Sequence, residues 1–235
     1  METIGVILAA GSGSRTGLST PKQFLMLGGK TVLEHSVEAF QQNAGITQIV
    51  IVTSKDFIPL VEQLAGKNHW SKVSAILPGG KERFDSSLSA VRAFADQPDA
   101  IMLFHDAARP LVSQRIISDT INAMKTYNCV DVAIPAVDTI VQCDADGQHM
   151  VSIQDRNLLW RMQTPQGFRQ KTIQAAYETA LKDPGFNATD DCGTVLRYLP
   201  DEKVGIVRGD ENNIKLTYAG DLPLLEFLLS GTIRK

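Results

Sequence analysis

The segment Ile4-Gly5-Val6-Ile7-Leu8-Ala9-Ala10-Gly11-Ser12-Gly13-Ser14-Arg15 decides the fold of this chain. Its apolar first part, residues 4–10, predicts a short buried strand, because such a run bounded by turn residues is typical of one. The glycines and serines that follow predict a loop at the carboxyl end of that strand. In open α/β sheets, ligands bind beyond the carboxyl ends of the strands. The segment therefore predicts an α/β fold with a ligand site at the loop.

The glycine loop is expected to hold phosphate groups. Its small residues let backbone N–H groups approach phosphate oxygens closely, and Arg15 and the nearby Lys22 add two positive charges. The loop lacks the third glycine of the dinucleotide fingerprint, and the Gly-Lys-Ser/Thr triplet of the nucleoside triphosphatases is absent. A plain turn that leaves a strand is the alternative interpretation, which the two cations disfavour. A triphosphate is the predicted ligand.

The composition limits the number of domains and the kinds of partner. The chain has 235 residues, a formal net charge of −3 and three cysteines. This length predicts one domain over residues 1–235. The weak charge predicts no binding to nucleic acid or to a membrane surface, so the basic residues are expected to form a local site. No apolar run approaches a membrane span and the start does not resemble a signal peptide, which predicts a cytoplasmic protein.

The three cysteines, Cys129, Cys143 and Cys192, lie far apart and form no Cys-x-x-Cys pair. This spacing argues against a disulfide framework or a thiolate zinc site. We expect buried or incidental thiols.

Short apolar runs alternate with longer amphipathic segments along the chain. This alternation predicts a Rossmann-like, doubly wound and mainly parallel sheet with helices on both faces. The expected strands are Ile4–Ala10, Gln48–Thr53, Val73–Leu77, Ile101–His105, Val130–Pro135 and Val204–Val207. The expected helices are Val32–Asn43, Phe57–Gly66, Glu82–Ala95, Arg115–Tyr127, Lys171–Leu181, Asp191–Tyr198 and Ala219–Leu229.

Residues 138–154 break this alternation. Two strand-like runs flank the turn signal Asp144-Ala145-Asp146-Gly147, which predicts a protruding β-arm. Because a two-stranded hairpin alone is marginally stable in water, the arm is expected to pack on a second subunit. Packing on its own domain is the alternative.

A second glycine turn precedes the expected helix 82–95. Gly79-Gly80-Lys81 allows close approach of the backbone, and a helix that begins here points free N–H groups toward an anion or a base edge. An ordinary turn before a helix with a solvated charged start is the alternative interpretation. Its place after a predicted parallel strand favours the site.

His105-Asp106-Ala107-Ala108-Arg109-Pro110 follows another apolar run. A carboxylate at the end of a central strand can hold Mg²⁺, and Arg109 can bind a phosphate with its planar fork. A surface ion pair between Asp106 and Arg109 is the alternative. His105 is expected to be packed or hydrogen-bonded rather than catalytic.

Two later segments are weaker indications of a functional site. Thr189-Asp190-Asp191 predicts the capped start of a helix, with acidic residues in its first turn. Lys215 lies in an extended polar segment before the last helix. Its side chain is either solvated or part of a phosphate site.

Taken in order, these segments resemble the cytidylyltransferases of the 2-C-methyl-D-erythritol 4-phosphate pathway of isoprenoid synthesis. The ribitol-5-phosphate cytidylyltransferases of wall and capsule synthesis are a sister family with most of the same motifs. Ala108 and Leu159-Trp160 are similar to the methylerythritol branch, whereas Val141 and residues 131–138 are similar to the ribitol branch. The segments that carry the resemblance are Leu8–Arg15, Pro21–Phe24, Gly79–Ser86, His105–Pro110, Asp138–Ile140, Asp155–Trp160, Gln163–Phe168, Thr189–Asp191 and Asn213–Thr217.

The resemblance implies transfer of CMP from CTP to a polyol phosphate with release of pyrophosphate. The first expected acceptor is 2-C-methyl-D-erythritol 4-phosphate, and ribitol 5-phosphate is the alternative. The resemblance also implies Mg²⁺ as the cofactor and a homodimer in which the neighbouring subunit supplies Arg156. A non-catalytic nucleotide-binding domain is a second hypothesis, because fold alone does not fix function.

The implied site residues fall into four groups. The catalytic residues are Arg15, Lys22, Arg156 and Lys215. The nucleotide-binding residues are Ala9, Ala10, Gly11, Gly13, Gly80, Lys81, Arg83, Ser86, Asp106 and Ala107. The acceptor-binding residues are Arg109, Thr139, Arg156, Thr164 and Lys215, and Asp106 is the metal ligand.

Overall fold

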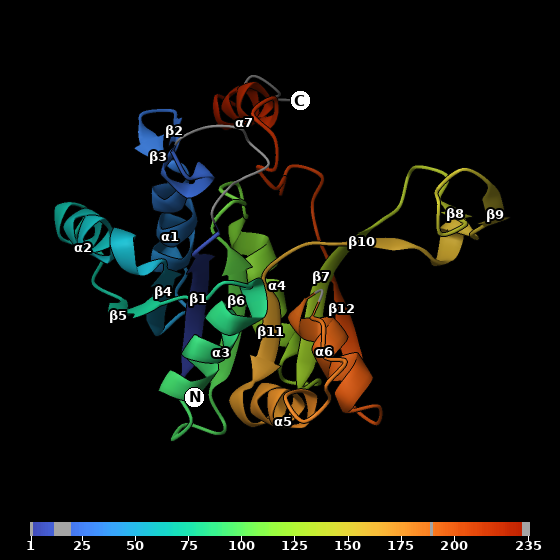
Figure 1. Cartoon of the computed structure of the whole chain (residues 1–235). Helices are drawn as coiled ribbons and strands as arrows, with labels where there is room; N and C mark the ends of the chain where they lie inside the picture. The colour runs from blue at the N-terminus through green and yellow to red at the C-terminus, as the bar shows by residue number, and fades with distance from the viewer. Residues whose placement is uncertain (1, 12–19, 189, 232–235) are drawn as a thin grey trace.

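A computed structural model of the chain describes residues 2–11, 20–188 and 190–231. Within these residues, eight strands form one central sheet in the order β10-β7-β11-β6-β1-β4-β5, with β12 paired to β7 (Figure 1). The strands are β1 Thr3–Ala9, β4 Gln48–Thr53, β5 Val73–Pro78, β6 Ile101–Asp106, β7 Cys129–Pro135, β10 Trp160–Met162, β11 Gln166–Arg169 and β12 Val204–Arg208.

The sheet is mainly parallel, as the sequence predicts. Strand β1 pairs in parallel with β4 and β6, β4 with β5, and β12 with β7. All six expected strands are present, with ends that differ by one residue. The sequence interpretation missed β11, which runs antiparallel between β6 and β7, and β10, which is antiparallel to β7.

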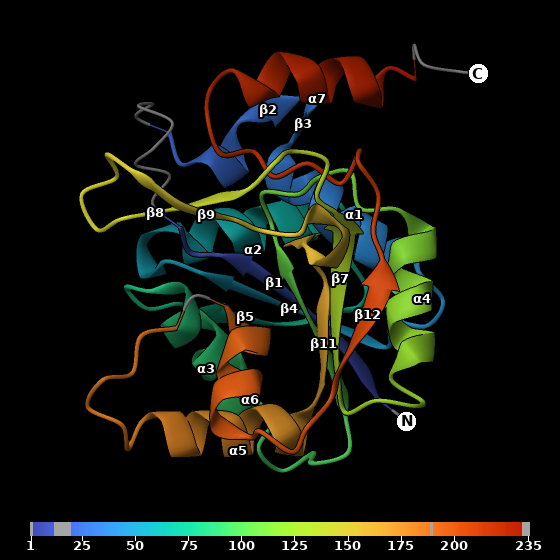
Figure 2. The same cartoon turned by 90° about the vertical axis from the view of Figure 1, so that its right-hand side faces the viewer.

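Helices cover both faces of the sheet (Figure 2). The core on one face contains side chains of α1 Val32–Gln42, α2 Ile58–Lys67 and α4 Gln114–Ala123. The other core contains side chains of α3 Arg83–Ala93, α5 Gln170–Ala180 and α6 Asp191–Tyr198. The doubly wound arrangement is therefore confirmed. The predicted helix 115–127 is too long, since α4 ends at Ala123 and turns follow it.

Close packing joins α1 to the first strand. A Cβ atom at Gly5 would collide with the ring of Phe40, which is fully buried. Burying such an apolar side chain contributes roughly 1.5–3 kcal/mol. The start of α1 is fixed by Thr31, whose hydroxyl accepts from the Glu34 N–H while the Glu34 carboxylate accepts from the Thr31 N–H.

A smaller layer lies beside the carboxyl ends of the central strands. Helix α7, Asp221–Leu229, packs with the short hairpin of β2 Met26–Leu27 and β3 Lys30–Thr31 (Figure 1). Leu27, Leu216 and Leu225 are fully buried between these elements. The packing brings the segment after β12 close to the segment after β1.

The predicted β-arm is confirmed. Strands β8 Val141–Cys143 and β9 Met150–Ile153 form a separate two-stranded antiparallel sheet, which protrudes from the body of the chain (Figure 1). Gly147 closes the turn with a positive φ of 68°. Met150, Val151 and Ile153 are each more than 60% exposed. The arm does not fold back to bury these side chains.

All three cysteines are free thiols, as expected, with Cys129 and Cys192 buried and Cys143 exposed. Within the described ranges, we find no helix that is long and apolar enough to cross a membrane.

Candidate active site

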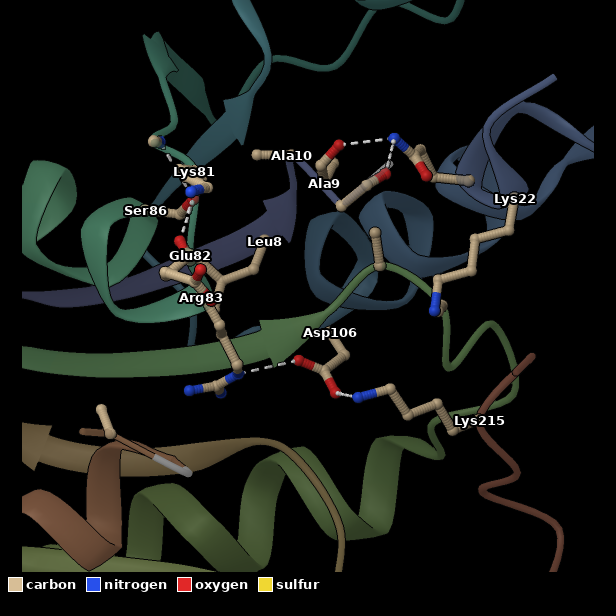
Figure 3. Close-up of a pocket in the computed structure, with 16 residues that line it drawn as sticks. Leu8, Ala9, Ala10, Lys22, Lys81, Glu82, Arg83, Ser86, Asp106 and Lys215 are labelled. Carbon is tan, nitrogen blue, oxygen red and sulfur yellow. Dashed lines mark hydrogen bonds and ion pairs between the residues drawn. The ribbon is translucent and has the colours of Figure 1, made fainter. Parts of the chain in front are cut away.

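A cavity of about 360 Å³ opens at the carboxyl ends of β1 and β6, beside the start of α3 (Figure 3). Lys22 and Lys215 line it, together with every described residue that the sequence assigned to the nucleotide. Those residues are Ala9, Ala10, Gly11, Gly80, Lys81, Arg83, Ser86, Asp106 and Ala107. Gly13, which carried the same prediction, and Arg15, which was predicted to be catalytic, lie outside the described residues.

The two glycine segments meet at the wall of this cavity. A Cβ atom at Gly79 would collide with the Ala10 Cβ and the Ser86 Oγ, so glycine is required for the close approach. The Gly80 N–H donates to Ser86 Oγ at 3.3 Å, and that hydroxyl donates to the Glu82 carbonyl at 3.5 Å. The second glycine turn thus lines the cavity through Gly80 and Lys81.

Gln23 is a pocket residue that the sequence interpretation missed. Its amide is buried and donates from Nε2 to the Ala9 carbonyl at 2.7 Å and to the Gly11 carbonyl at 3.2 Å. It follows Lys22 in η2, the 3-10 helix Lys22–Phe24. Gln23 therefore ties the end of β1 to the short helix that carries Lys22. The signal in the sequence was its place in the Pro21–Phe24 motif.

Asp106 is the charged centre of the cavity. The Arg83 Nε lies 3.3 Å from its Oδ1, and the Lys215 Nζ lies 2.7 Å from its Oδ2 (Figure 3). Burial would raise the pKa of Asp106, but Arg83 and Lys215 hold that pKa well below its usual range. The carboxylate is therefore ionised throughout the physiological range.

Hydrogen bonds fix the backbone on both sides of Asp106. Its N–H donates to Thr164 Oγ1 at 3.2 Å, and that hydroxyl lies 2.9 Å from His105 Nδ1, which accepts its proton in the neutral ring whose Nε2 is the donor. The other ring nitrogen of His105 donates from Nε2 to the Arg109 carbonyl at 3.0 Å. Burial lowers the pKa of His105 to about 4, in agreement with this neutral ring. His105 is packed and hydrogen-bonded, as predicted.

Arg109 holds the segment that carries Lys215. Its Nη1 donates to the Asn213 carbonyl at 2.7 Å, and its Nη2 donates to the Met162 carbonyl at 3.4 Å. Asp106 forms its ion pairs with Arg83 and Lys215, so the alternative of an Asp106–Arg109 pair is wrong. Arg109 and Thr164 do not line the cavity but support residues that do.

Thr139 and Arg156 lie on the arm side of the molecule. Both are exposed, and neither lines the cavity of its own chain. Arg156 begins η4, the 3-10 helix Arg156–Leu158, and its Nη1 donates to the Val137 carbonyl at 3.1 Å. A single chain therefore does not bring these two acceptor candidates to the other site residues.

The residues present suit a metal ion that a nucleotide brings with it. In the part of the chain that the structure describes, no three His, Cys, Asp or Glu side chains are grouped to hold a metal. Mg²⁺ in phosphate sites usually takes one or two carboxylates together with substrate phosphates. Asp106, ionised and at the wall of a cavity, fits that need.

The site combines backbone loops, several cations and the carboxylates of Asp106 and Glu82 around one cavity. Its chemistry is the binding of phosphates and the neutralisation of their charge. The fold and the site together define a nucleotidyltransferase. A family model described as "IspD: 2-C-methyl-D-erythritol 4-phosphate cytidylyltransferase" matches residues 3–231. The chain belongs to this family of cytidylyltransferases, which confirms the resemblance seen in its sequence.

Individual relatives match nearly the whole chain. A 2-C-methyl-D-erythritol 4-phosphate cytidylyltransferase from Thermobifida fusca is 47% identical over 95% of this chain and 91% of its own. A bifunctional ribulose 5-phosphate reductase/CDP-ribitol pyrophosphorylase from Haemophilus influenzae is 47% identical over 98% of this chain but only 48% of its own. A solved 4-diphosphocytidyl-2C-methyl-D-erythritol synthase from Anaerococcus prevotii matches with a TM-score of 0.84 and 29% identity, over 97% of this chain and 96% of that one.

Proposed function

We propose that this protein transfers CMP from CTP to 2-C-methyl-D-erythritol 4-phosphate and releases pyrophosphate. The observation that carries the proposal is the cavity around Asp106, which gathers the residues expected for the nucleotide with Lys22 and Lys215. The family match over residues 3–231 supports the acceptor.

The reaction needs positioning and charge neutralisation more than proton transfer. An oxygen of the acceptor phosphate forms a bond to the α-phosphorus while the bond from that phosphorus to the β-phosphate oxygen breaks. The nucleophile is already anionic, so no general base is required. Lys22 and Arg15 are assigned to the negative charge that develops on the α-phosphate and the leaving group. Mg²⁺ bound with the phosphates at Asp106 would neutralise part of the same charge.

The acceptor site is proposed to form between two copies of the chain. Arg156 and Thr139 are exposed and lie outside the cavity of their own chain, while Lys215 lines it. The arm also leaves Val151 and Ile153 63% exposed, which a second subunit would bury. A homodimer with exchanged arms would bring Arg156 and Thr139 to the cavity of the other chain and would bury the apolar residues of the arm. A cytoplasmic location belongs to the same proposal, because the reaction consumes CTP.

Ribitol 5-phosphate is the competing acceptor. The Haemophilus influenzae relative named as a CDP-ribitol pyrophosphorylase shares 47% identity over 98% of this chain. Both acceptors offer a phosphate, so the enzyme must discriminate between their carbon skeletons. A pocket for the branching methyl group discriminates by about 1–3 kcal/mol, whereas a site that hydrogen-bonds an extra hydroxyl can discriminate more strongly.

The test compares both acceptors in a pyrophosphate-release assay with CTP and Mg²⁺. We expect kcat/KM for 2-C-methyl-D-erythritol 4-phosphate to exceed that for ribitol 5-phosphate by about tenfold or more. A higher kcat/KM for ribitol 5-phosphate would replace the proposed acceptor. CTP binding without pyrophosphate release from either acceptor would support the non-catalytic alternative.

A further inference from the structure

Arg83 is held between two carboxylates that come from different parts of the chain. Its Nε faces Asp106 Oδ1 at 3.3 Å, and its Nη1 donates to Asp191 Oδ2 at 2.5 Å. Asp106 ends β6, whereas Asp191 is the first residue of α6. A planar guanidinium with partners on both sides has a fixed position and a fixed rotation.

Asp191 is itself held on both of its oxygens. Tyr177 on α5 donates its hydroxyl to Asp191 Oδ1, and Ser87 on α3 donates its hydroxyl to Oδ2 at 3.1 Å. Asp191, Tyr177 and Ser87 are all fully buried. Asp191 does not line the cavity, but Arg83 and Asp106 do. The two hydroxyls, Asp191, Arg83 and Asp106 therefore form a continuous network of contacts from α5 and α6 to the cavity.

The positive and negative charges in this network balance. Arg83 and Lys215 supply two positive charges, and Asp106 and Asp191 supply two negative charges. Removing the Asp191 charge leaves one excess positive charge in this network, and Arg83, whose side chain is 26% exposed, loses the acceptor that holds its Nη1. In this site the remaining carboxylate is Asp106. Loss of Asp191 would therefore move the group proposed to hold the metal and the nucleotide.

We propose that Asp191 is a positioning residue for nucleotide transfer, which acts by locking Arg83 so that Asp106 keeps its orientation toward the substrate. Tyr177 and Ser87 hold Asp191 in place. This inference rests on the proposed reaction at the Asp106 cavity. It assigns a function to a residue that was not among the site residues implied by the sequence.

The first test is Asp191→Asn, which keeps the size of the side chain and removes its charge. We expect kcat/KM for CTP to fall about 10–100-fold, the range typical for residues that orient a metal ligand. The dissociation constant of CTP, measured by calorimetry, should rise as well. The matched control is Glu34→Gln, since Glu34 is only 2% exposed and also accepts several hydrogen bonds, but lies outside the cavity. This variant should lose stability and keep its CTP kinetics.

A double-mutant cycle distinguishes positioning from general stability. Arg83→Lys keeps the positive charge but cannot bridge both carboxylates with a planar fork, so we expect a loss similar to that of Asp191→Asn. If Asp191 acts through Arg83, the double variant should be no worse than the poorer single variant. Tyr177→Phe leaves the ion pair intact and should show a smaller loss in the same direction.

The outcomes separate this inference from the proposed function. Normal kinetics and normal CTP binding in Asp191→Asn, or a cycle in which the two losses multiply, would overturn the positioning role. The same holds if Asp191→Asn lowers only the melting temperature. If Asp191→Asn does not fold, the comparison of Tyr177→Phe and Arg83→Lys with Glu34→Gln decides in the same way. A wild-type protein that releases no pyrophosphate contradicts the proposed function, while CTP binding still tests the inference.

Discussion

Lys215 Nζ lies 2.7 Å from Asp106 Oδ2, although one residue ends β6 and the other follows β12. The Lys215 side chain is 35% exposed and lines the cavity while it contacts the carboxylate. A lysine has three donor positions and can contact Asp106 and a substrate phosphate together. The carboxylate therefore fixes the cation where the acceptor phosphate is proposed to bind.

This geometry predicts a large effect of Lys215→Gln. The variant loses the charge proposed for the acceptor phosphate, and kcat/KM for the acceptor should fall about 10²–10³-fold. Steady-state kinetics with varied acceptor at saturating CTP measures the loss. Lys67→Gln is the control, because Lys67 is exposed and pairs with Glu34 outside the cavity. An equal effect of the two substitutions would contradict the assignment.

Lys22→Ala should reduce turnover more than CTP affinity. Its charge is needed most when the α-phosphate becomes crowded and more negative, and one such donor typically contributes about 10²–10³ in rate. Arg15→Ala is expected to behave in the same way. Single-turnover rates and CTP dissociation constants separate the two effects. If both variants keep normal turnover, this charge assignment is wrong.

Gln23→Met tests the support of the nucleotide loop. The substitution keeps an unbranched side chain but removes the donor that serves the Ala9 and Gly11 carbonyls. The Ala9 carbonyl keeps only the longer hydrogen bond from Thr53 Oγ1 at 3.4 Å, so the free energy of unfolding should fall by about 1 kcal/mol, the cost of a typical lost hydrogen bond. KM for CTP should rise, because the end of β1 loses its tie to η2. Denaturant unfolding and steady-state kinetics on the same sample measure both effects. An unchanged KM for CTP would show that Gln23 contributes to the stability of the fold but not to CTP binding.

Local patterns predicted the parallel strands and the position of a cavity at their carboxyl ends, because both depend on short apolar runs and on where those runs end. Strand β11 was missed for the opposite reason. Its four residues include Gly167, and a Cβ there would press against the Met124 Sδ and the Thr120 side chain of the α4 region. That glycine reflects tertiary crowding, which no local pattern shows. The partners of Arg109 and Asp191 are equally remote in sequence and appear only once the sheet is assembled.

Asp131→Asn should change how stability depends on pH. Burial raises the pKa of Asp131 from 3.8 to about 7, despite the hydrogen bond that Gln166 Nε2 donates to its Oδ1. The folded protein thus holds a proton that the unfolded chain releases between these pH values. The stability contributed by this carboxyl is complete below pH 3.8 and is lost as the pH rises through 7.

The variant has no such proton to lose. We therefore expect its free energy of unfolding to gain about 3 kcal/mol relative to the wild type between pH 4 and pH 7. Subtracting the wild-type free energy of unfolding from that of the variant at each pH removes the contributions of the other titrating groups. One of these is His105, whose lowered pKa changes stability with pH in the opposite direction. Denaturant unfolding at pH 4, 5.5 and 7 measures it. A difference that stays constant with pH would show that Asp131 titrates normally.

Exchange of the arms is tested by mixing two inactive chains. In a mixed dimer of Arg156→Ala and Lys22→Ala chains, exchanged arms place both defects in one site and leave the other site intact. Random exchange of equal amounts should then restore about a quarter of wild-type activity, since half of the dimers are mixed and each has one working site. Each parent alone should remain poorly active.

The control for exchange uses the same two chains with different affinity tags, so that mixed dimers are isolated and counted. If the arm instead serves the site of its own chain, every site in the mixed dimer carries one defect and no activity returns. The placement of Arg156, exposed and outside the cavity of its own chain, favours recovery. Isolated mixed dimers without activity would show that Arg156 does not act across the interface.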